Sequence, residues 1–245
     1  MYSYDMTEER RKLLNDFQEK YFLKFKNIEL LNQAMCHTSF TNENNIDVSN
    51  SYERLEFLGD AVLKLSISKL LYSKFKEYQE GKLTKLRAEI VSDKTISTYA
   101  QKIGLGELLL LGKNEKKHGG SKKESILACA FEALLGAIFL ENGARGYKKA
   151  YDFLYDNFKD EILDINNHIS LLNPKAILQE YTQGINHDLP KYNLVKEVGK
   201  EHDKTFFVEI EYQNKIIGKG SAKSIKLAHQ EAAADAIKNL GVNKE

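Results

Sequence analysis

Residues 126–140 read ILACAFEALLGAIFL, a stretch in which Glu132 is the only charged side chain. Apolar residues at this density predict a helix that is buried on all sides. An ionised carboxylate in such surroundings is costly unless it is paired with a cation or binds a metal. Two explanations for Glu132 follow: it lies at the rim of the core beside a lysine or arginine, or it belongs to a metal site.

A second candidate helix lies upstream, where residues 51–65 read SYERLEFLGDAVLKL. On a helix with about 100° per residue, its acidic side chains fall within about 60° of one another, opposite an apolar set. The acidic set is Glu53, Glu56 and Asp60, and the apolar set is Leu55, Leu58, Val62 and Leu65. One explanation is the solvated acidic face of an amphipathic helix.

The other explanation joins the two helices, so that Glu132 faces Glu56 and Asp60 in one cluster of carboxylates. Such a cluster repels itself, and one or two divalent cations relieve the repulsion. Ligands that are all oxygen favour Mg²⁺, Mn²⁺ or Ca²⁺ over zinc. Carboxylate sites of this kind with Mg²⁺ are typical of phosphoryl chemistry, in which the metal activates water.

The rest of the chain predicts two parts. Residues 1–160 contain no proline and repeat apolar residues at helical spacing, with glycine-marked loops at residues 80–81 and 112–121. Residues 161–173 have the composition of a linker. Residues 174–243 predict a small α+β domain in the order helix, three strands, helix, with a first helix that stops at Gly184 and a last helix closed by Gly241.

Composition excludes several classes. The formal net charge of the 245 residues is +1, so any basic surface has to come from local clusters such as KGSAKSIK at residues 219–226. The first residues lack the plan of a signal peptide, and no apolar run approaches the ~20 residues of a membrane helix. Cys36 and Cys129 fit no zinc spacing. We expect a cytoplasmic protein with reduced thiols and no membrane partner.

Several motifs together resemble the ribonuclease III family. ERLEFLGDAVL at 53–63 is similar to the signature of that family, and CHTSF at 36–40 is similar to a second segment of it. The stretches at 80–92 and 121–140 fit the later nuclease blocks. NPKAILQEYTQG and GKGSAKSIKLAHQEAA, in the C-terminal part, resemble a double-stranded RNA-binding domain.

This resemblance implies an all-helical nuclease domain, an α-β-β-β-α RNA-binding domain, and a homodimer that cuts both strands of double-stranded RNA. The implied products carry 5′-phosphates and short 3′ overhangs, the implied cofactor is Mg²⁺ with Mn²⁺ as a substitute, and rRNA and mRNA precursors are the implied substrates. By position, Glu56, Asp60 and Glu132 resemble the metal ligands, with Asp60 and Glu132 catalytic. Glu53, Glu80 and Glu115 match supporting acidic positions, and Phe57 matches an aromatic residue of the dimer interface.

One departure from the family pattern concerns Cys129, which stands where the family usually has an aspartate. A residue one helical turn before Glu132 should share its face. A protonated thiol is a poor Mg²⁺ ligand. Cys129 either packs as a small apolar residue or contributes weakly to the metal site. If the substitution removes cleavage, the chain is instead a protein that only binds double-stranded RNA; a helical metal protein unrelated to the family is a further alternative.

A-form RNA is recognised through 2′-hydroxyls and phosphates across its minor grooves. The residues expected to make these contacts are Gln179 and Gln183 on the first helix of the C-terminal domain, His202 in a loop, and Lys223 and Lys226 at the start of the last helix. Ile225 replaces a lysine of the family pattern, and Lys219 and Lys223 were candidates to offset that loss. A solvated lysine face is the alternative explanation. His37 and His118 receive no chemical role.

Overall fold

The computed structural model describes residues 6–172, 174–200 and 203–241. It divides into two compact units, Met1–Leu163 and Asp164–Glu245. The elements of the first unit are α1 (Glu8–Lys20), α2 (Ile28–Ala34), α3 (Thr38–Glu43), η1 (Val48–Asn50), α4 (Glu53–Lys74), α5 (Glu80–Ile90), α6 (Asp93–Lys102), α7 (Leu105–Leu108), α8 (Lys113–Lys117), η2 (Gly120–Lys122), α9 (Glu124–Glu141), η3 (Gly143–Arg145) and the larger part of α10 (Gly146–Leu172).

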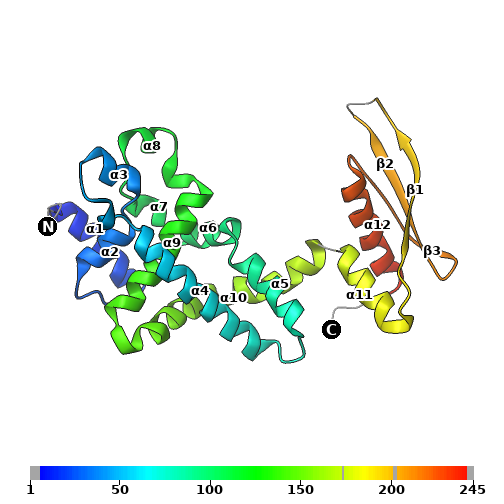
Figure 1. The fold of residues 1–245 in the computed structure, drawn as a ribbon, viewed down its shortest axis with the longest axis horizontal. Coiled ribbons are helices and arrows are strands. Elements are labelled where there is room, and N and C mark those ends of the chain that lie inside the picture. The colour runs from blue at the N-terminus through cyan, green and yellow to red at the C-terminus, as the bar shows by residue number, and fades with distance from the viewer. Residues whose placement is uncertain (1–5, 173, 201–202, 242–245) are drawn as a thin grey trace. The chain divides into compact units, whose positions relative to one another are not determined.

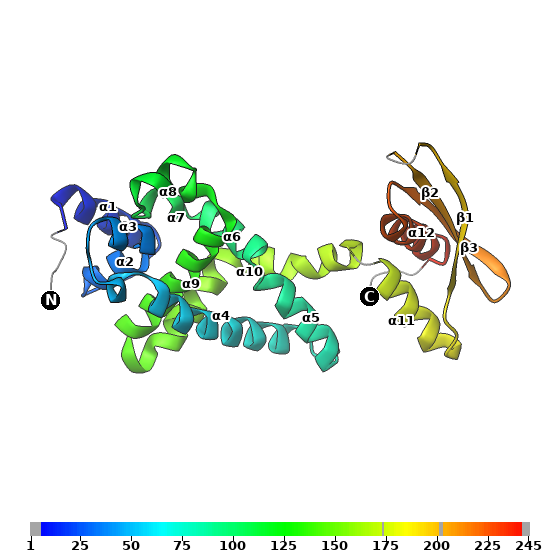
Figure 2. The ribbon, with the colours of Figure 1, turned by 45° about the horizontal axis from the view of Figure 1, so that its top comes forward.

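Helix α9 is the centre of the first unit. Its apolar side chains are almost all buried, because α2, α4 and α6 pack against it from different sides. Figure 1 shows α9 in the middle of this unit with α4 beside it, and Figure 2 shows the same two helices side by side. Phe131 of α9 is fully buried among the rings of Tyr99, Phe153 and Phe158. Residues 126–140 therefore form the buried core helix that their composition predicted.

Two glycines allow α4 and α9 to approach very closely. A Cβ atom added at Gly59 would lie 1.7 Å from the carbonyl oxygen of Glu132, and one added at Gly136 would lie 2.2 Å from the carbonyl oxygen of Leu55. No side chain fits between backbones at such distances, so glycine is required at both crossing points. This contact places the first turns of α4, which carry Glu56 and Asp60, beside Glu132 of α9.

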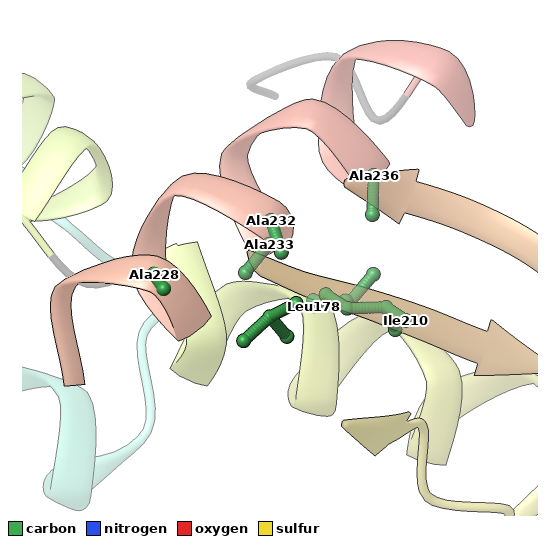
Figure 3. Close-up of a cluster of buried hydrophobic side chains, with 7 residues drawn as sticks. Leu178, Ile210, Ala228, Ala232, Ala233 and Ala236 are labelled. Carbon is green, nitrogen blue, oxygen red and sulfur yellow. The ribbon is translucent and has the colours of Figure 1, made fainter. Parts of the chain in front are cut away.

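The second unit consists of α11 (Pro174–Asn186), β1 (Lys191–Val198), β2 (Thr205–Tyr212), β3 (Lys215–Ala222) and α12 (Ile225–Asn239). The three strands form an antiparallel sheet in the order β1-β2-β3. Helices α11 and α12 pack together, and alanines of α12 meet Leu178 and Ile210 in the core that Figure 3 shows. The predicted fold class, a helical unit followed by a small α-β-β-β-α unit, is confirmed.

The structure differs from the sequence prediction at several boundaries. Residues 161–172, expected to form a linker, continue α10; Ile162 is fully buried, and no proline interrupts the helix before Pro174. Helix α11 passes Gly184 and ends at Asn186, because the Tyr212 hydroxyl of β2 donates to Asn186 and to the carbonyl of Thr182. Helix α5 starts at Glu80, and the segment 112–121 contains α8 and the start of η2.

One side chain of the predicted apolar face of α4 is also placed differently. Leu55 and Val62 are buried as expected, whereas Leu65 is 57% exposed. The reason is that α9 covers the face of α4 that contains Gly59, and Leu65 lies outside that face.

Candidate active site and RNA-binding surface

A hollow of about 670 Å³ gathers most of the predicted carboxylates of the first unit. Its lining residues are Glu53, Glu56, Phe57, Asp60, Lys64, Val91, Asp93 and Glu132. They come from three places: the N-terminal half of α4, the start of α6 with the residues just before it, and the middle of α9. The structure thus brings Glu56 and Asp60 together with Glu132, a residue more than seventy positions away in the chain.

The Glu132 side chain is half-buried and surrounded by other acids. Its pKa is raised from the ordinary 4.5 to about 8, first by burial, then by the negative charges of Asp60 and Glu56 and by a hydrogen bond to Asp60. The hydrogen bond requires Glu132 to carry the proton and donate it to Asp60. No cationic partner accounts for this glutamate among the described residues, so the ion-pair explanation from the sequence finds no support here.

The other two carboxylates are held in place by neighbours. Asp60 accepts a hydrogen bond from Lys64 Nζ at 2.7 Å, one helical turn further along α4. Burial raises the pKa of Glu56, whereas a hydrogen bond from the Cys129 thiol lowers it; the charges of Glu53, Asp93 and Asp60 raise it again. The pKa values of Glu56 and Glu132 therefore both depend on the charges of the neighbouring acids.

Cys129 lies one helical turn before Glu132 on α9, next to the hollow. Its thiol donates a hydrogen bond to Glu56 and accepts one from the Tyr52 hydroxyl. The pKa of the thiol is raised to about 12, first by burial and then by the negative charges of Glu56 and Glu132. The thiol is consequently neutral at physiological pH and contributes polarity to the site but no charge.

The donor set fits a hard divalent cation, since three mutually repelling carboxylates with oxygen donors surround one open hollow. A bound cation would replace both the proton of Glu132 and the ammonium of Lys64 as counter-charge. In the geometry seen here, however, no three His, Cys, Asp or Glu side chains of the described residues already stand as a coordination group. The carboxylates are instead engaged in the hydrogen bonds given above, so metal binding has to rearrange side chains.

The three acids predicted to support the metal site lie in different surroundings. Glu53 lines the hollow, but Glu80 does not; it accepts a hydrogen bond from Thr84 on its own helix, at 2.8 Å. Glu115 accepts one from Lys123 Nζ at 2.5 Å, and this contact lowers its pKa.

His37 is influenced by two of these acids, Glu115 and Glu53. Burial lowers the pKa of His37, whereas the negative charges of the two acids raise it. Its Nδ1 accepts from the backbone N–H of Ser39 at 3.0 Å at the start of α3, which gives His37 a structural role.

The sequence analysis missed two residues that line the hollow, Lys64 and Asp93, and one residue beside Cys129, Tyr52. Lys64 could have been found, because residues four apart on a helix are neighbours and its charge is opposite to that of Asp60. Asp93 could not, because its place depends on how α6 packs against α9. Tyr52 was quoted within the signature stretch, but only the structure shows its buried ring beside Cys129.

Phe57 is strongly exposed, with 83% of its surface accessible. Beside it lies a second hollow of about 620 Å³, lined by Leu30, Gln33, Glu53, Arg54, Leu55, Phe57, Leu58 and Leu140. Leu140 is itself half exposed. An aromatic side chain next to an apolar hollow on one surface has the geometry of a self-complementary contact.

In the second unit, the predicted RNA contacts lie on the surface. Gln179 and Gln183 are exposed one turn apart on α11, and Lys223 and Lys226 are exposed at the start of α12. Ser224 caps α12, accepting from the backbone N–H of Leu227 at 3.3 Å, so that the positive end of the helix adjoins both lysines. His202 lies outside the described residues.

The lysines of this unit are not equivalent. Lys223 Nζ donates to Asp203 Oδ1 at 2.6 Å, whereas Lys226 has no acidic partner among the residues described. Lys219 pairs with Glu209 at 2.7 Å on the face of the sheet opposite α12. Both Lys219 and Lys223 are therefore paired with a carboxylate in this structure, and the part of Lys219 in offsetting Ile225 stays a prediction.

Comparisons with known proteins agree with both units. Residues 27–161 match the family model described as ribonuclease-III-like, and residues 174–240 match the double-stranded RNA binding motif. The combination defines the chain as an endoribonuclease that acts on double-stranded RNA. The chain belongs to the ribonuclease III family.

Its relatives include ribonuclease 3 of Natranaerobius thermophilus, 45% identical over 86% of this chain and 90% of the relative, and that of Borreliella burgdorferi, 41% identical over 96% and 94%. A solved nuclease domain of ribonuclease III from Campylobacter jejuni is 37% identical, with a TM-score of 0.53, over 60% of this chain and 99% of that domain. That structure concerns flexibility in a region involved in dimer formation. Within the described residues, no helix is both long and apolar enough for a membrane span.

Proposed function

We propose that the chain is a Mg²⁺-dependent homodimeric nuclease that hydrolyses both strands of double-stranded RNA, leaving 5′-phosphates and short 3′ overhangs. Mn²⁺ should substitute for Mg²⁺. The observation that carries the proposal is the convergence of Glu56, Asp60 and Glu132 from two helices in one hollow, where the pKa of Glu132 is raised to about 8. Carboxylates this close repel one another when they are ionised, and a bound divalent cation relieves that repulsion.

Each side chain of the hollow has a defined task in this proposal. Glu56, Asp60 and Glu132 would hold the metal, and Asp60 and Glu132 are the proposed catalytic pair. When bound, the metal would activate water and stabilise the leaving oxygen of the phosphodiester. Glu132 has to lose its proton to serve as a ligand. Lys64 leaves Asp60 at the same time, and its ammonium is then available to the phosphate backbone of the RNA.

The homodimer is proposed from the surface around Phe57. In a twofold arrangement, each Phe57 enters the apolar hollow beside Leu58 and Leu140 of the other copy. Burial of an aromatic side chain that is 83% exposed in the single chain supplies part of the association free energy. Two copies would present two sites to one duplex, which accounts for cleavage of both strands.

The proposed substrates are rRNA and mRNA precursors with double-stranded segments, and the proposed compartment is the cytoplasm. Both are carried over from the family. The second unit would hold the duplex through Gln179, Gln183 and Lys226, with His202 and Lys223 as further contacts. Because A-form RNA is recognised mainly by shape, we expect little dependence on base sequence from this unit.

The test is cleavage of a long RNA duplex by the purified full chain, with MgCl₂, with MnCl₂ and with EDTA. We expect short duplex products with either metal and none with EDTA. Glu132→Gln and Asp60→Asn should each lower the rate by at least about 100-fold while duplex binding persists. Glu124→Gln, a change of equal charge at the exposed start of the same helix, is the control. Cleavage by Glu132→Gln at the rate of the unmodified chain would contradict the assignment.

A second candidate function is binding of double-stranded RNA without cleavage. The neutral thiol of Cys129 in the metal hollow favours it, since the site then has one negative ligand fewer than the family pattern. This alternative predicts that the natural chain is inactive at every Mg²⁺ and Mn²⁺ concentration and that Cys129→Asp restores cleavage. The intact set Glu56, Asp60 and Glu132 supports the nuclease instead.

A further inference from the structure

Asp93 is an acidic residue of the hollow to which neither the motifs nor the family resemblance assigned a role. It is the first residue of α6 and lines the same hollow as Glu56, Asp60 and Glu132. Helix α6 packs against α9, and this packing carries Asp93 to the site. The residue is exposed, and no cationic partner holds its carboxylate among the residues that the structure describes.

The start of α6 explains how Asp93 is held. Ser92 caps the helix, with its hydroxyl oxygen accepting from the backbone N–H of Thr95 at 3.3 Å. An acid in the first helical turn is favourable by itself, because it complements the positive end of the helix. That explanation requires only the helix and would apply equally to Glu8, which follows the Thr7 cap of α1 in the same position.

The surroundings of Asp93 go beyond a helix start. Its charge acts on Glu56, on Cys129 and on Glu132, three groups on two different helices. The charge of Glu53, the other acid at the edge of the hollow, acts on Glu56 as well. Asp93 differs from Glu53 in its origin, because it reaches the hollow from α6, whereas Glu53 belongs to α4 together with Glu56 and Asp60.

Cys129 adds no charge to the site. It lies one helical turn before Glu132, its thiol contacts Glu56, and a thiol in these surroundings stays protonated. We propose that Asp93 is a positioning residue that supplies to the metal hollow a negative charge that Cys129 cannot supply. This inference rests on the proposed metal-dependent function. Mg²⁺ and Mn²⁺ keep several of their waters in such sites, so a carboxylate can hold the hydrated ion without direct ligation.

The experiment measures Mn²⁺ binding to the full chain by isothermal titration calorimetry, without RNA. The variants are Asp93→Asn, Cys129→Asp and the two combined, with Glu8→Gln as the matched control at a helix start. Asp93→Asn should weaken Mn²⁺ binding by about tenfold, as loss of an outer-shell partner does. In the Cys129→Asp background the same change should weaken it by about twofold or less, because the new carboxylate replaces the missing charge.

Three further measurements separate the possible outcomes. Asp93→Glu, which keeps the charge, should bind Mn²⁺ like the unmodified chain, and thermal unfolding without metal should show that Asp93→Asn is folded. Unchanged Mn²⁺ binding by Asp93→Asn, together with a loss in Asp60→Asn, would overturn the role of Asp93 and leave the metal site intact. An equal loss in both backgrounds would overturn the link to Cys129. Equal binding by Asp60→Asn and the unmodified chain would instead refute the proposed metal site itself.

Discussion

At the scale of single residues, the site is governed by charges that the fold forces together. Glu132 is the clearest case: its sequence surroundings are apolar, yet in the structure the charges of Asp60 and Glu56 act on it. The carboxyl group of Glu132 therefore needs a proton or a cation inside a helix that is otherwise apolar. Cys129 modifies this balance by removing one charge without removing a polar contact.

The first prediction at this scale concerns Cys129→Asp. A carboxylate at position 129 adds a negative oxygen donor beside Glu56, so the hollow should bind Mg²⁺ more tightly. We expect the Mg²⁺ concentration for half-maximal cleavage to fall by about tenfold, with much less change in the saturated rate. Mn²⁺, which accepts softer ligands, should help the natural chain more than the variant. The measurement is cleavage rate against metal concentration on one short duplex, and superimposable curves would show that position 129 does not influence the metal.

The second prediction at this scale concerns how the stability of the metal-free protein depends on pH. The pKa of Glu132 is raised to about 8 in the folded chain, from 4.5, so the folded state binds this proton more strongly than the unfolded state. Between those two pH values the unfolded chain carries fewer protons at this residue, and stability therefore falls as pH rises. Glu132→Gln, which keeps the hydrogen-bond capacity and cannot ionise, should flatten this part of the profile.

Thermal unfolding in EDTA between about pH 5 and about pH 8 tests this difference between the two proteins. A parallel decline for the natural chain and Glu132→Gln would show that Glu132 does not carry it. Saturating Mg²⁺ should reverse the trend for the natural chain, because the metal binds the ionised form.

At the scale of elements, the contact between α4 and α9 decides the site. Glu56 and Asp60 lie one turn apart around Gly59, and Gly59 rests on the carbonyl of Glu132. The glycine that allows the helices to approach therefore lies between the two carboxylates along α4. The start of α6 adds Asp93, and the exposed side of α4 adds Phe57, so one helix serves both the metal hollow and the proposed dimer surface.

The prediction at this scale is that Gly59→Ala is strongly destabilising. The added methyl group would lie 1.7 Å from the carbonyl oxygen of Glu132, so the helices have to separate. We expect a loss of at least about 2 kcal/mol in the free energy of unfolding and a corresponding loss of cleavage. Gly81→Ala is the control, because its Cβ meets no atom within 4 Å on α5; it should gain about 0.5 kcal/mol. Similar melting of the two variants would rule out the close packing of α4 on α9.

At the scale of the whole molecule, two units divide the work. The first contains the hollow and the surface around Phe57, and the second presents glutamines and lysines at its helices. Charge is likewise organised locally: the chain as a whole carries +1, and the cationic start of α12 is a feature of a few residues. Catalysis and most of the phosphate contacts should therefore be separable.

The prediction at this scale is that residues 1–172 alone remain dimeric and cut duplex RNA only at low salt. Phosphate contacts of the second unit supply much of the salt-dependent affinity, so their loss should be tolerated at about 50 mM salt and not at about 200 mM. Cleavage assays at both salt concentrations and analytical ultracentrifugation give the two readouts. The fragment with Phe57→Lys should sediment as a monomer. Equal activity of the fragment and the full chain at the higher salt concentration would contradict the division of work.

The sequence predicted correctly the features that depend on residues within one helix or strand, and it missed features that depend on contacts between elements. The core helix at 126–140, the three strands and the acidic face of α4 follow from periodicity along a single element. The end of α11 did not, because a contact from Tyr212 extends that helix past Gly184. The helical conformation of residues 161–172 was missed because their composition suggested a linker, while burial of Ile162 favours the helix.

The sequence by itself determined that Glu56 and Asp60 share one helix face and that Glu132 sits in an apolar helix, since both facts depend only on spacing within a helix. Tertiary structure alone decided which groups meet there. Packing of α6 against α9 brought in Asp93, Glu80 stayed outside the hollow with Thr84, and Lys219 turned to Glu209 on the far face of the sheet. The physical reason is that charges act through space, and the distances between separate elements are fixed only when the elements pack.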